Sequence, residues 1–321
     1  MRRRHVLARL ALVPFAALAL SEAAHLAGRR VEGTGHAQPA AWKAPTTPWG
    51  APDLQGIWTY ATMTPLERPR ELAGKPVLSK EEAVEYERQV IARQSVTNNT
   101  AGPDWWDPGT QRLVDRRSSL IVDPEDGRLP PPVEAATQRA AARAQLRPRG
   151  SLTDGPEDLG LNVRCLLWST AGPPMLPGVY NNNVQFVQTR TYTAIVSEMI
   201  HDARIVPTDG RPHGTVPRWM GDSRGHWEGA TLVVDTINFT GKTEFRGATE
   251  QLHLVERFTR VDADTIEYRF TAEDPATWTR PWTAAFPLKR TTQPMYEYAC
   301  HEGNFRSMEG LLKGAAVQRV P

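Results

Sequence analysis

The sequence predicts a mainly β protein in which an irregular segment with one or two helices precedes an antiparallel meander. Short apolar, β-branched segments follow one another after Arg164, and no helical pattern lies between them. Turn residues such as Asp209-Gly210 and Asp262-Ala263-Asp264 separate several of them. About eight short strands at close spacing favour a meander, and closing it into a barrel removes the exposed edges. A two-sheet sandwich fits the pattern nearly as well.

Residues 1–37 are predicted to be an export signal. Arg2-Arg3-Arg4 forms a positive segment, residues 6–20 are mainly apolar, and cleavage can follow Ala23 or Ala37. A membrane anchor is the less favoured alternative, because the uninterrupted apolar stretch falls short of about 20 residues. No later segment is apolar enough to span a bilayer. We therefore expect a periplasmic or secreted protein without a membrane span after signal removal.

The net charge of +2 is concentrated in this N-terminal segment. Residues 1–37 contain six Arg and two Glu, so the remainder of the chain carries −2. Proteins that bind nucleic acid need Lys and Arg gathered on one face to neutralise phosphates. The sequence therefore predicts no nucleic-acid partner.

Residues 38–160 are predicted to form an N-terminal strand followed by a helical and irregular cover. Ser79-Lys80-Glu81-Glu82 is typical of a helix start, with Ser as the N-cap and acidic residues in the first turn. Apolar residues at helical spacing continue this helix to residue 94. The other predicted elements are a strand at 53–59, a strand at 119–122 and a surface helix at 134–146.

Residues 161–321 are assigned to the barrel domain, with residues 147–160 as a linker or lid before it. The predicted strands cover residues 184–189, 192–200, 203–206, 231–239, 252–260, 265–271, 282–288 and 295–300. The segment at 220–227 is interpreted as a glycine-flanked loop that enters a strand.

The two cysteines, Cys165 and Cys300, form one even pair in a chain with an export signal. This usage predicts a disulfide between the start of the second half and its last strand. The alternative is a thiol nucleophile, because His301 follows Cys300 directly. We rank the alternative lower, since an oxidising compartment would consume a free thiol.

Gly56-Ile57-Trp58 resembles the Gly-x-Trp of the first strand in lipocalin-like (calycin-like) barrels, in which the Trp plugs one end. Gly225-His226-Trp227 has the same spacing. Longer stretches resemble a group of secreted bacterial proteins, and the likeness implies export and a shared fold without a catalytic assignment. Those stretches are residues 52–58, 220–229 and 296–304.

Histidine and carboxylate side chains crowd the second half. A histidine beside a carboxylate can act as a general base, with the acid fixing its tautomer. Adjacent residues of a strand point to opposite faces, so Asp202 can orient His201 only if the chain turns there. We expect the barrel interior to hold both apolar and proton-transferring side chains. The candidate catalytic residues are His201, Asp202, His213, His226 and His253.

The strand at 252–260 leaves its orientation open. Glu256 lies on the face of Leu254 and Phe258, whereas His253 lies on the other face. If the leucines face the interior, Glu256 does as well, and a buried carboxylate needs a partner or a function. An ion pair with Arg269 on the neighbouring strand is slightly favoured.

The candidate substrate-binding residues are Arg224 and Arg257, which would steady negative charge, and the aromatic residues Trp227 and Tyr268. The histidines have no diagnostic metal-ligand spacing, so a divalent metal is the minority interpretation. The sequence has no nucleophile elbow, phosphate-binding loop or dinucleotide fingerprint, and no organic cofactor is predicted.

Two function hypotheses follow. The favoured one is an exported enzyme without an organic cofactor that performs acid–base chemistry, of isomerase, lyase, hydratase or cyclase type, on a small, partly apolar substrate. The alternative is a non-catalytic carrier or sensor of a hydrophobic ligand. An interaction module of the cell envelope is supported only by the extra segment at 60–160.

Overall fold

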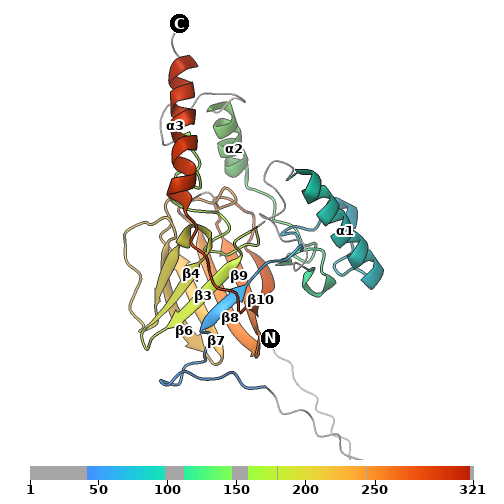
Figure 1. The fold of residues 1–321 in the computed structure, drawn as a ribbon, viewed down its shortest axis with the longest axis vertical. Helices are drawn as coiled ribbons and strands as arrows, with labels where there is room; N and C mark the ends of the chain where they lie inside the picture. The colour runs from blue at the N-terminus through green and yellow to red at the C-terminus, as the bar shows by residue number, and fades with distance from the viewer. Residues whose placement is uncertain (1–41, 98–111, 147–157, 179, 244, 319–321) are drawn as a thin grey trace, which may run out of the picture. The chain divides into compact units, whose positions relative to one another are not determined.

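A computed structural model describes residues 42–97, 112–146, 158–178, 180–243 and 245–318. Within these residues ten antiparallel strands form one sheet that nearly closes into a barrel (Figure 1). The strand order is β5-β4-β3-β1-β10-β9-β8-β7-β6, and β2 pairs with β10 outside this path. The strands are β1 (Gly56–Thr59), β2 (Ile121–Asp123), β3 (Asn183–Gln188), β4 (Tyr192–Ser197), β5 (Ala203–Pro207), β6 (Asp222–Glu228), β7 (Thr231–Ile237), β8 (His253–Asp262), β9 (Thr265–Glu273) and β10 (Trp282–Arg290).

The alternation of burial along the strands determines which residues face the interior. In β8, Leu254, Glu256 and Phe258 are fully buried, whereas the residues between them are partly exposed. In β7, Leu232 and Val234 are fully buried in the same core cluster. Since side chains of a strand alternate between faces, the even-numbered positions of β7 and β8 point inward.

The chain that leads into β1 is bonded to the barrel, because Arg260 of β8 donates to the main-chain oxygen of Asp53 at 2.9 Å. Trp58 is fully buried, and its indole nitrogen donates to the main-chain oxygen of Leu54 at 3.0 Å. The guanidinium groups of Arg290 and Arg260 lie 4.4 and 5.5 Å from the centre of the Trp58 ring. Cations over the Trp58 ring add attraction to its packing.

The barrel closes without a ladder between its two terminal strands. In the described residues β5 and β6 are the ends of the strand order. A Cβ added to Gly225 in β6 would lie 2.9 Å from Val206 Cγ1 of β5 and 3.0 Å from Thr208 Cγ2. The missing side chain of Gly225 therefore lets the two edges approach by side-chain packing.

The helix α1 (Lys80–Thr97) begins at the predicted cap. The main-chain N–H of Glu82 donates to Ser79 Oγ at 3.1 Å, and that of Ser79 donates to Glu82 Oε2 at 2.9 Å. Each group thus satisfies a donor that the first helical turn leaves free. A separate apolar cluster packs α1 against neighbouring chain through Ala83, Met63, Leu78 and Leu113.

The helix α2 (Glu134–Leu146) also forms where the sequence predicts it. Arg139 of α2 donates to the main-chain oxygen of Ala276 at 2.7 Å. Short 3-10 turns occur at η1 (Arg70–Leu72), η3 (Val114–Arg116) and η5 (Met199–His201).

Two elements differ from the sequence prediction. The strand expected at 295–300 is absent: residues 291–299 are irregular, and α3 (Cys300–Gln318) begins at the cysteine. Pro294 has no N–H for a ladder, and the N–H of Tyr296 donates instead to Glu198 Oε1 at 3.0 Å. β6 was not predicted, because its outer positions are charged and its inner positions Ser223 and Gly225 are small.

Candidate functional site

Residues 158–178 form a cap at the barrel end opposite Trp58. The N–H of Met175 donates to the hydroxyl oxygen of Tyr268 at 3.1 Å, and Tyr268 points into the barrel. Met175 and Leu176 belong to the barrel core cluster. The Tyr60 hydroxyl, just after β1, lies 3.5 Å from the main-chain oxygen of Thr170. The cap is therefore packed into the barrel end.

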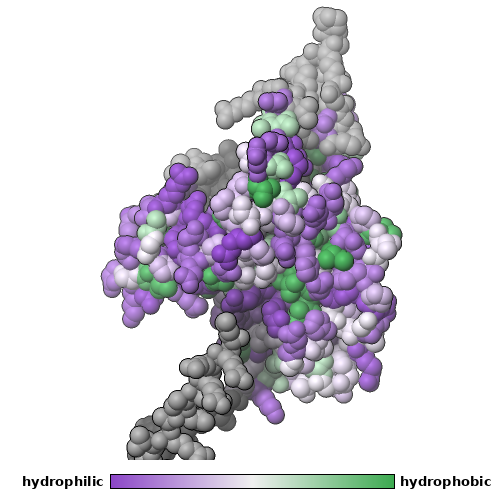
Figure 2. Space-filling view, turned by 180° about the vertical axis from the view of Figure 1, so that it is seen from behind, coloured by the Kyte–Doolittle hydropathy of each residue, from purple (hydrophilic) through white to green (hydrophobic). Residues whose placement is uncertain are grey.

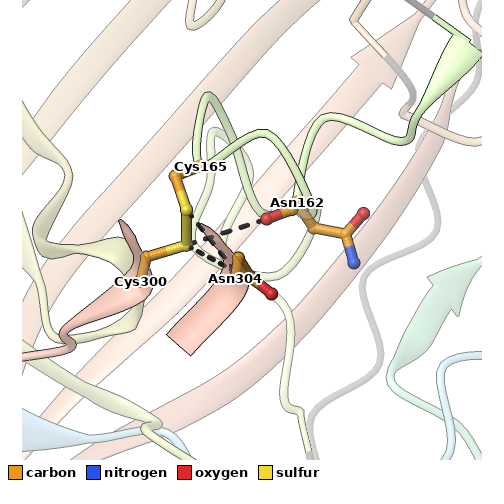
Figure 3. The surroundings of a disulfide bond; sticks show 4 residues. All are labelled: Asn162, Cys165, Cys300 and Asn304. Carbon is orange, nitrogen blue, oxygen red and sulfur yellow. Dashed lines mark hydrogen bonds between the residues drawn. A yellow bond between two sulfur atoms is a disulfide. The ribbon is translucent and has the colours of Figure 1, made fainter. Parts of the chain in front are cut away.

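The predicted disulfide ties this cap to α3. Cys165 and Cys300 are bonded across a separation of 135 residues, and Figure 3 shows Asn304 beside both sulfurs. The Asn304 amide nitrogen donates to Cys300 Sγ at 3.1 Å and to Cys165 Sγ at 3.5 Å. Cys300 Sγ lies 3.8 Å from the main-chain oxygen of Asn162, a plain contact because a disulfide sulfur carries no hydrogen. The disulfide ends at a helix start, not at a strand.

A pocket of about 200 Å³ lies between the cap and the connection from β7 to β8. Its apolar wall includes Trp168 and Phe245, and Phe245 stacks on the buried Trp282 with ring centres 6.0 Å apart. Polar side chains from both walls also reach it. The lining residues are Leu161, Asn162, Leu167, Trp168, Ser169, Gly172, Pro173, Thr243 and Phe245.

Three aromatic rings support the cap from the side of α3. Trp168 meets Tyr180 and Tyr298 edge-on, each with ring centres 6.2 Å apart, and the two tyrosine rings stack at 6.4 Å. Burial, together with a hydrogen bond to Tyr298, raises the pKa of Tyr180 to about 12. The phenol is therefore neutral at physiological pH. These contacts hold the Trp168 ring in one orientation beside the pocket.

The predicted site residues His201 and Asp202 lie at the turn after β4. The chain does turn there, with Ile200 and His201 at φ of 58° and 48°. Burial raises the pKa of Asp202 to about 6, although the charge of His201 opposes the shift. Asp202 Oδ2 has no hydrogen-bond partner among the described residues, and His201 is exposed. This raised pKa places the protonation equilibrium of the Asp202 carboxyl close to neutral pH.

The barrel interior contains a buried ion pair. Arg204 of β5 binds both carboxylate oxygens of Glu256, with Nη2 to Oε1 at 3.0 Å, and the Tyr268 hydroxyl donates to Glu256 Oε1 at 2.7 Å. Burial raises the pKa of Tyr268 well above its usual range. The favoured ion pair between Glu256 and Arg269 is therefore wrong, because Arg269 pairs in register with Arg257 on the outer face.

Two predicted histidines meet on the outer face of the sheet. His213, from the loop after β5, has Nε2 2.9 Å from Asp235 Oδ1 and Nδ1 3.3 Å from Asp222 Oδ2. His253 Nε2 lies 2.6 Å from the other oxygen of Asp235. Although burial alone would raise the pKa of Asp222, hydrogen bonds from the Gly214 N–H and Arg224 hold it below its usual range. We call His213, Asp222, Asp235 and His253 the outer imidazole cluster.

The remaining predicted residues do not join this cluster. Glu228 links His226 and Arg257, with Nε2 to Oε1 at 3.1 Å and Nη2 to Oε2 at 2.6 Å, and all three are solvent-accessible. Trp227 packs partly against the barrel core. His201, His213, His226, His253 and His301 all lie outside the barrel, contrary to the expectation that imidazoles face its interior.

The described residues contain no group of three or more His, Cys, Asp or Glu side chains placed to hold a metal ion. No helix among them is long and apolar enough to cross a membrane. Figure 2 shows one face of the molecule, on which small hydrophobic patches are scattered between hydrophilic residues. Such scattered patches are ordinary on a protein surface. The pocket under the cap, lined by Trp168 and Phe245, is the more distinctive feature.

Sequence reasoning missed the pocket residues of the cap. Trp168 and Phe245 were not selected, since neither belongs to a predicted strand or to the histidine-rich segments. The available signal was Cys165, because a disulfide marks the segment 161–173 as anchored and not as a free linker.

No family model matches the sequence, and no curated protein matches it. A crystal structure of a variant of the fluorescent protein UnaG is similar over 35% of this chain and 72% of that chain, with 11% sequence identity and a TM-score of 0.23.

Proposed function

We propose that this protein is exported and reversibly binds one small, partly apolar molecule in the pocket under the cap. The observation that carries the proposal is the lining of that pocket, in which Trp168 and Phe245 face polar groups of Asn162, Ser169 and Thr243. Binding sites for small molecules are mainly apolar with a few placed polar groups.

The pocket volume indicates the size of the ligand group that the pocket holds. An apolar cavity of about 150 Å³ holds a benzene ring, and this pocket measures about 200 Å³. The ligand class is therefore a single ring, or a chain of similar size, with one or two hydrogen-bonding groups. The interior ion pair of Arg204 and Glu256 is fully used within the fold and takes no part.

A blocking substitution tests this proposal. Ser169 is exposed at the pocket wall, so Ser169→Leu fills the pocket without disturbing the core. Tryptophan fluorescence is titrated with single-ring aromatic alcohols and amides, and native mass spectrometry is run against extracted metabolites. We expect saturable binding that weakens by about tenfold or more in Ser169→Leu. Thr215→Leu, an exposed change in the loop after β5, is the matched control.

Equal binding by the native protein, Ser169→Leu and Thr215→Leu would place the ligand elsewhere and end the proposal. The absence of any saturable ligand among both the compounds and the extracts has the same consequence.

The second candidate function is the acid–base enzyme predicted from the sequence. The hydrogen bonds of His213 and His253 to Asp235 favour it, because a carboxylate can orient an imidazole for proton transfer. Mass spectrometry of the released ligand separates the two candidates. A carrier returns its ligand unchanged, whereas an enzyme returns a product, and His213→Gln would then slow its formation.

A further inference from the structure

A second pocket lies far along the chain from the cap, beside η1 and the turn after β2. Its volume is about 530 Å³, and three arginines line it: Arg68, Arg70 and Arg128. Pro69 and Pro76 add apolar surface to its wall. None of these residues belongs to the cap pocket or to the outer imidazole cluster.

Arg68 is the unusual member, because it is a buried cation without a carboxylate. Its exposed fraction is 6%, and its Nε donates to Oγ of the neutral Ser118 at 3.0 Å. No carboxylate oxygen of a described residue lies within 4.0 Å of its guanidinium. Buried charges are ordinarily paired, since removing a charge from water is costly.

The turn after β2 brings main chain against this guanidinium. Gly127 has a φ of +70°, and a Cβ added there would lie 3.0 Å from Arg68 Nη2 and 2.4 Å from Ser119 Oγ. Arg128, the next residue, donates from Nη1 to the main-chain oxygen of Arg68 at 2.8 Å. The Arg128 side chain is therefore held against the main chain of Arg68.

The other two guanidinium groups are also weakly neutralised. The nearest carboxylate to Arg128 is that of Glu67, at 4.0 Å. Arg70 is exposed and makes no ion pair with a described residue. Glu125 and Asp126 contribute to the pocket wall as well, so the lining carries three cations and two anions. This balance suits one anionic group and not a polyanion such as a nucleic acid.

We propose that this pocket binds the oxyanion group, carboxylate or phosphate, of a small molecule. Arginine is suited to this role because its planar group presents paired N–H donors that match two oxygens of a carboxylate or phosphate. Arg70 and Arg128 bind the oxygens, and Arg68 supplies fixed positive charge behind them.

Isothermal titration calorimetry with the full chain tests the proposal, using inorganic phosphate, benzoate and neutral benzamide as probes. Arg70→Gln and Arg128→Gln are both at partly or fully exposed positions, so neither substitution removes a buried side chain. Arg88→Gln, an exposed change on α1 where Arg88 pairs with Glu85, is the control. We expect saturable binding of phosphate or benzoate that weakens by about tenfold in each pocket variant, and none of benzamide.

The preferred probe then identifies which oxyanion the pocket takes. Absence of binding by both anions, equal binding of benzamide, or binding unchanged in Arg70→Gln and Arg128→Gln would overturn the proposal. Ser169→Leu separates the two sites: it blocks the cap pocket and leaves anion binding unchanged.

Discussion

At the scale of single residues, the most informative position is Glu256. Parity along β8 left two orientations open, and the structure selects the one in which the leucines and Glu256 point inward. Its partner Arg204 lies 52 residues earlier on β5. Strand alternation predicted that a buried Glu256 must be paired. It did not predict which arginine is the partner, because that depends on how the sheet closes into a barrel.

Replacing Glu256 by Gln is expected to destabilise the fold by about 3–5 kcal/mol, because Arg204 would remain buried without its anion. The double change Glu256→Leu with Arg204→Met should recover most of this loss, since both charges then disappear together. Urea denaturation measures both variants. A Glu256→Gln protein that is nearly as stable as the native one would show that the ion pair contributes little.

Asp202 predicts a dependence of stability on pH. Its folded pKa of about 6 is above the ordinary 3.8, so the folded state holds a proton that the unfolded chain releases between these values. The stabilisation of the folded state by this proton is therefore fully present below about pH 4 and is lost as pH rises through about 6. Asp202→Asn should be more stable than the native protein by about 1 kcal/mol at neutral pH, after allowance for solvent screening. This gain should vanish near pH 4.

Denaturant midpoints measured across this pH range test the prediction, with Asp209→Asn as the control. Hydrogen bonds from Arg211 lower the pKa of the exposed Asp209 to about 2, so Asp209 stays ionised across this range. A constant difference between Asp202→Asn and the native protein at every pH would contradict the assignment.

At the scale of elements, the sequence identified regular strands and capped helices better than polar edges. The β-branched alternation of β3, β4, β7, β8, β9 and β10 predicted strands close to the observed ones. The sequence did not predict β6, because its composition is not typical of a strand. Asp222, Arg224 and His226 face outward, and Gly225 lies against β5. The tyrosine-rich segment at 295–300 alternates like a strand, yet no sheet edge accepts it.

The disulfide between the cap and α3 is expected to stabilise the fold. Replacing Cys165 and Cys300 together by Ser should cost about 2–5 kcal/mol, since the bond closes a long loop. It should also weaken binding in the cap pocket, because the segment 161–173 would lose its anchor to α3. Thermal denaturation and the fluorescence titration measure the two effects, with the oxidised and reduced native protein as references. Unchanged melting would contradict the prediction.

At the scale of the whole molecule, the antiparallel barrel was predictable and its contents were not. The alternation of apolar and polar residues can be recognised within short stretches of sequence, and it predicts the fold class. The contents depend on which way the whole sheet curls, and this choice places the imidazoles of His213 and His253 outside and the charges of Arg204 and Glu256 inside. The cap pocket was missed for a related reason, since its walls come from segments that are distant in sequence.

The contact between β5 and β6 at Gly225 determines where the barrel opens most readily. In the described residues no ladder joins β5 to β6. The main-chain N–H and C=O groups along the facing edges of these two strands therefore have no ladder partner. Hydrogen–deuterium exchange should therefore start along Ala203–Pro207 and spread last to β9, which is bonded on both sides.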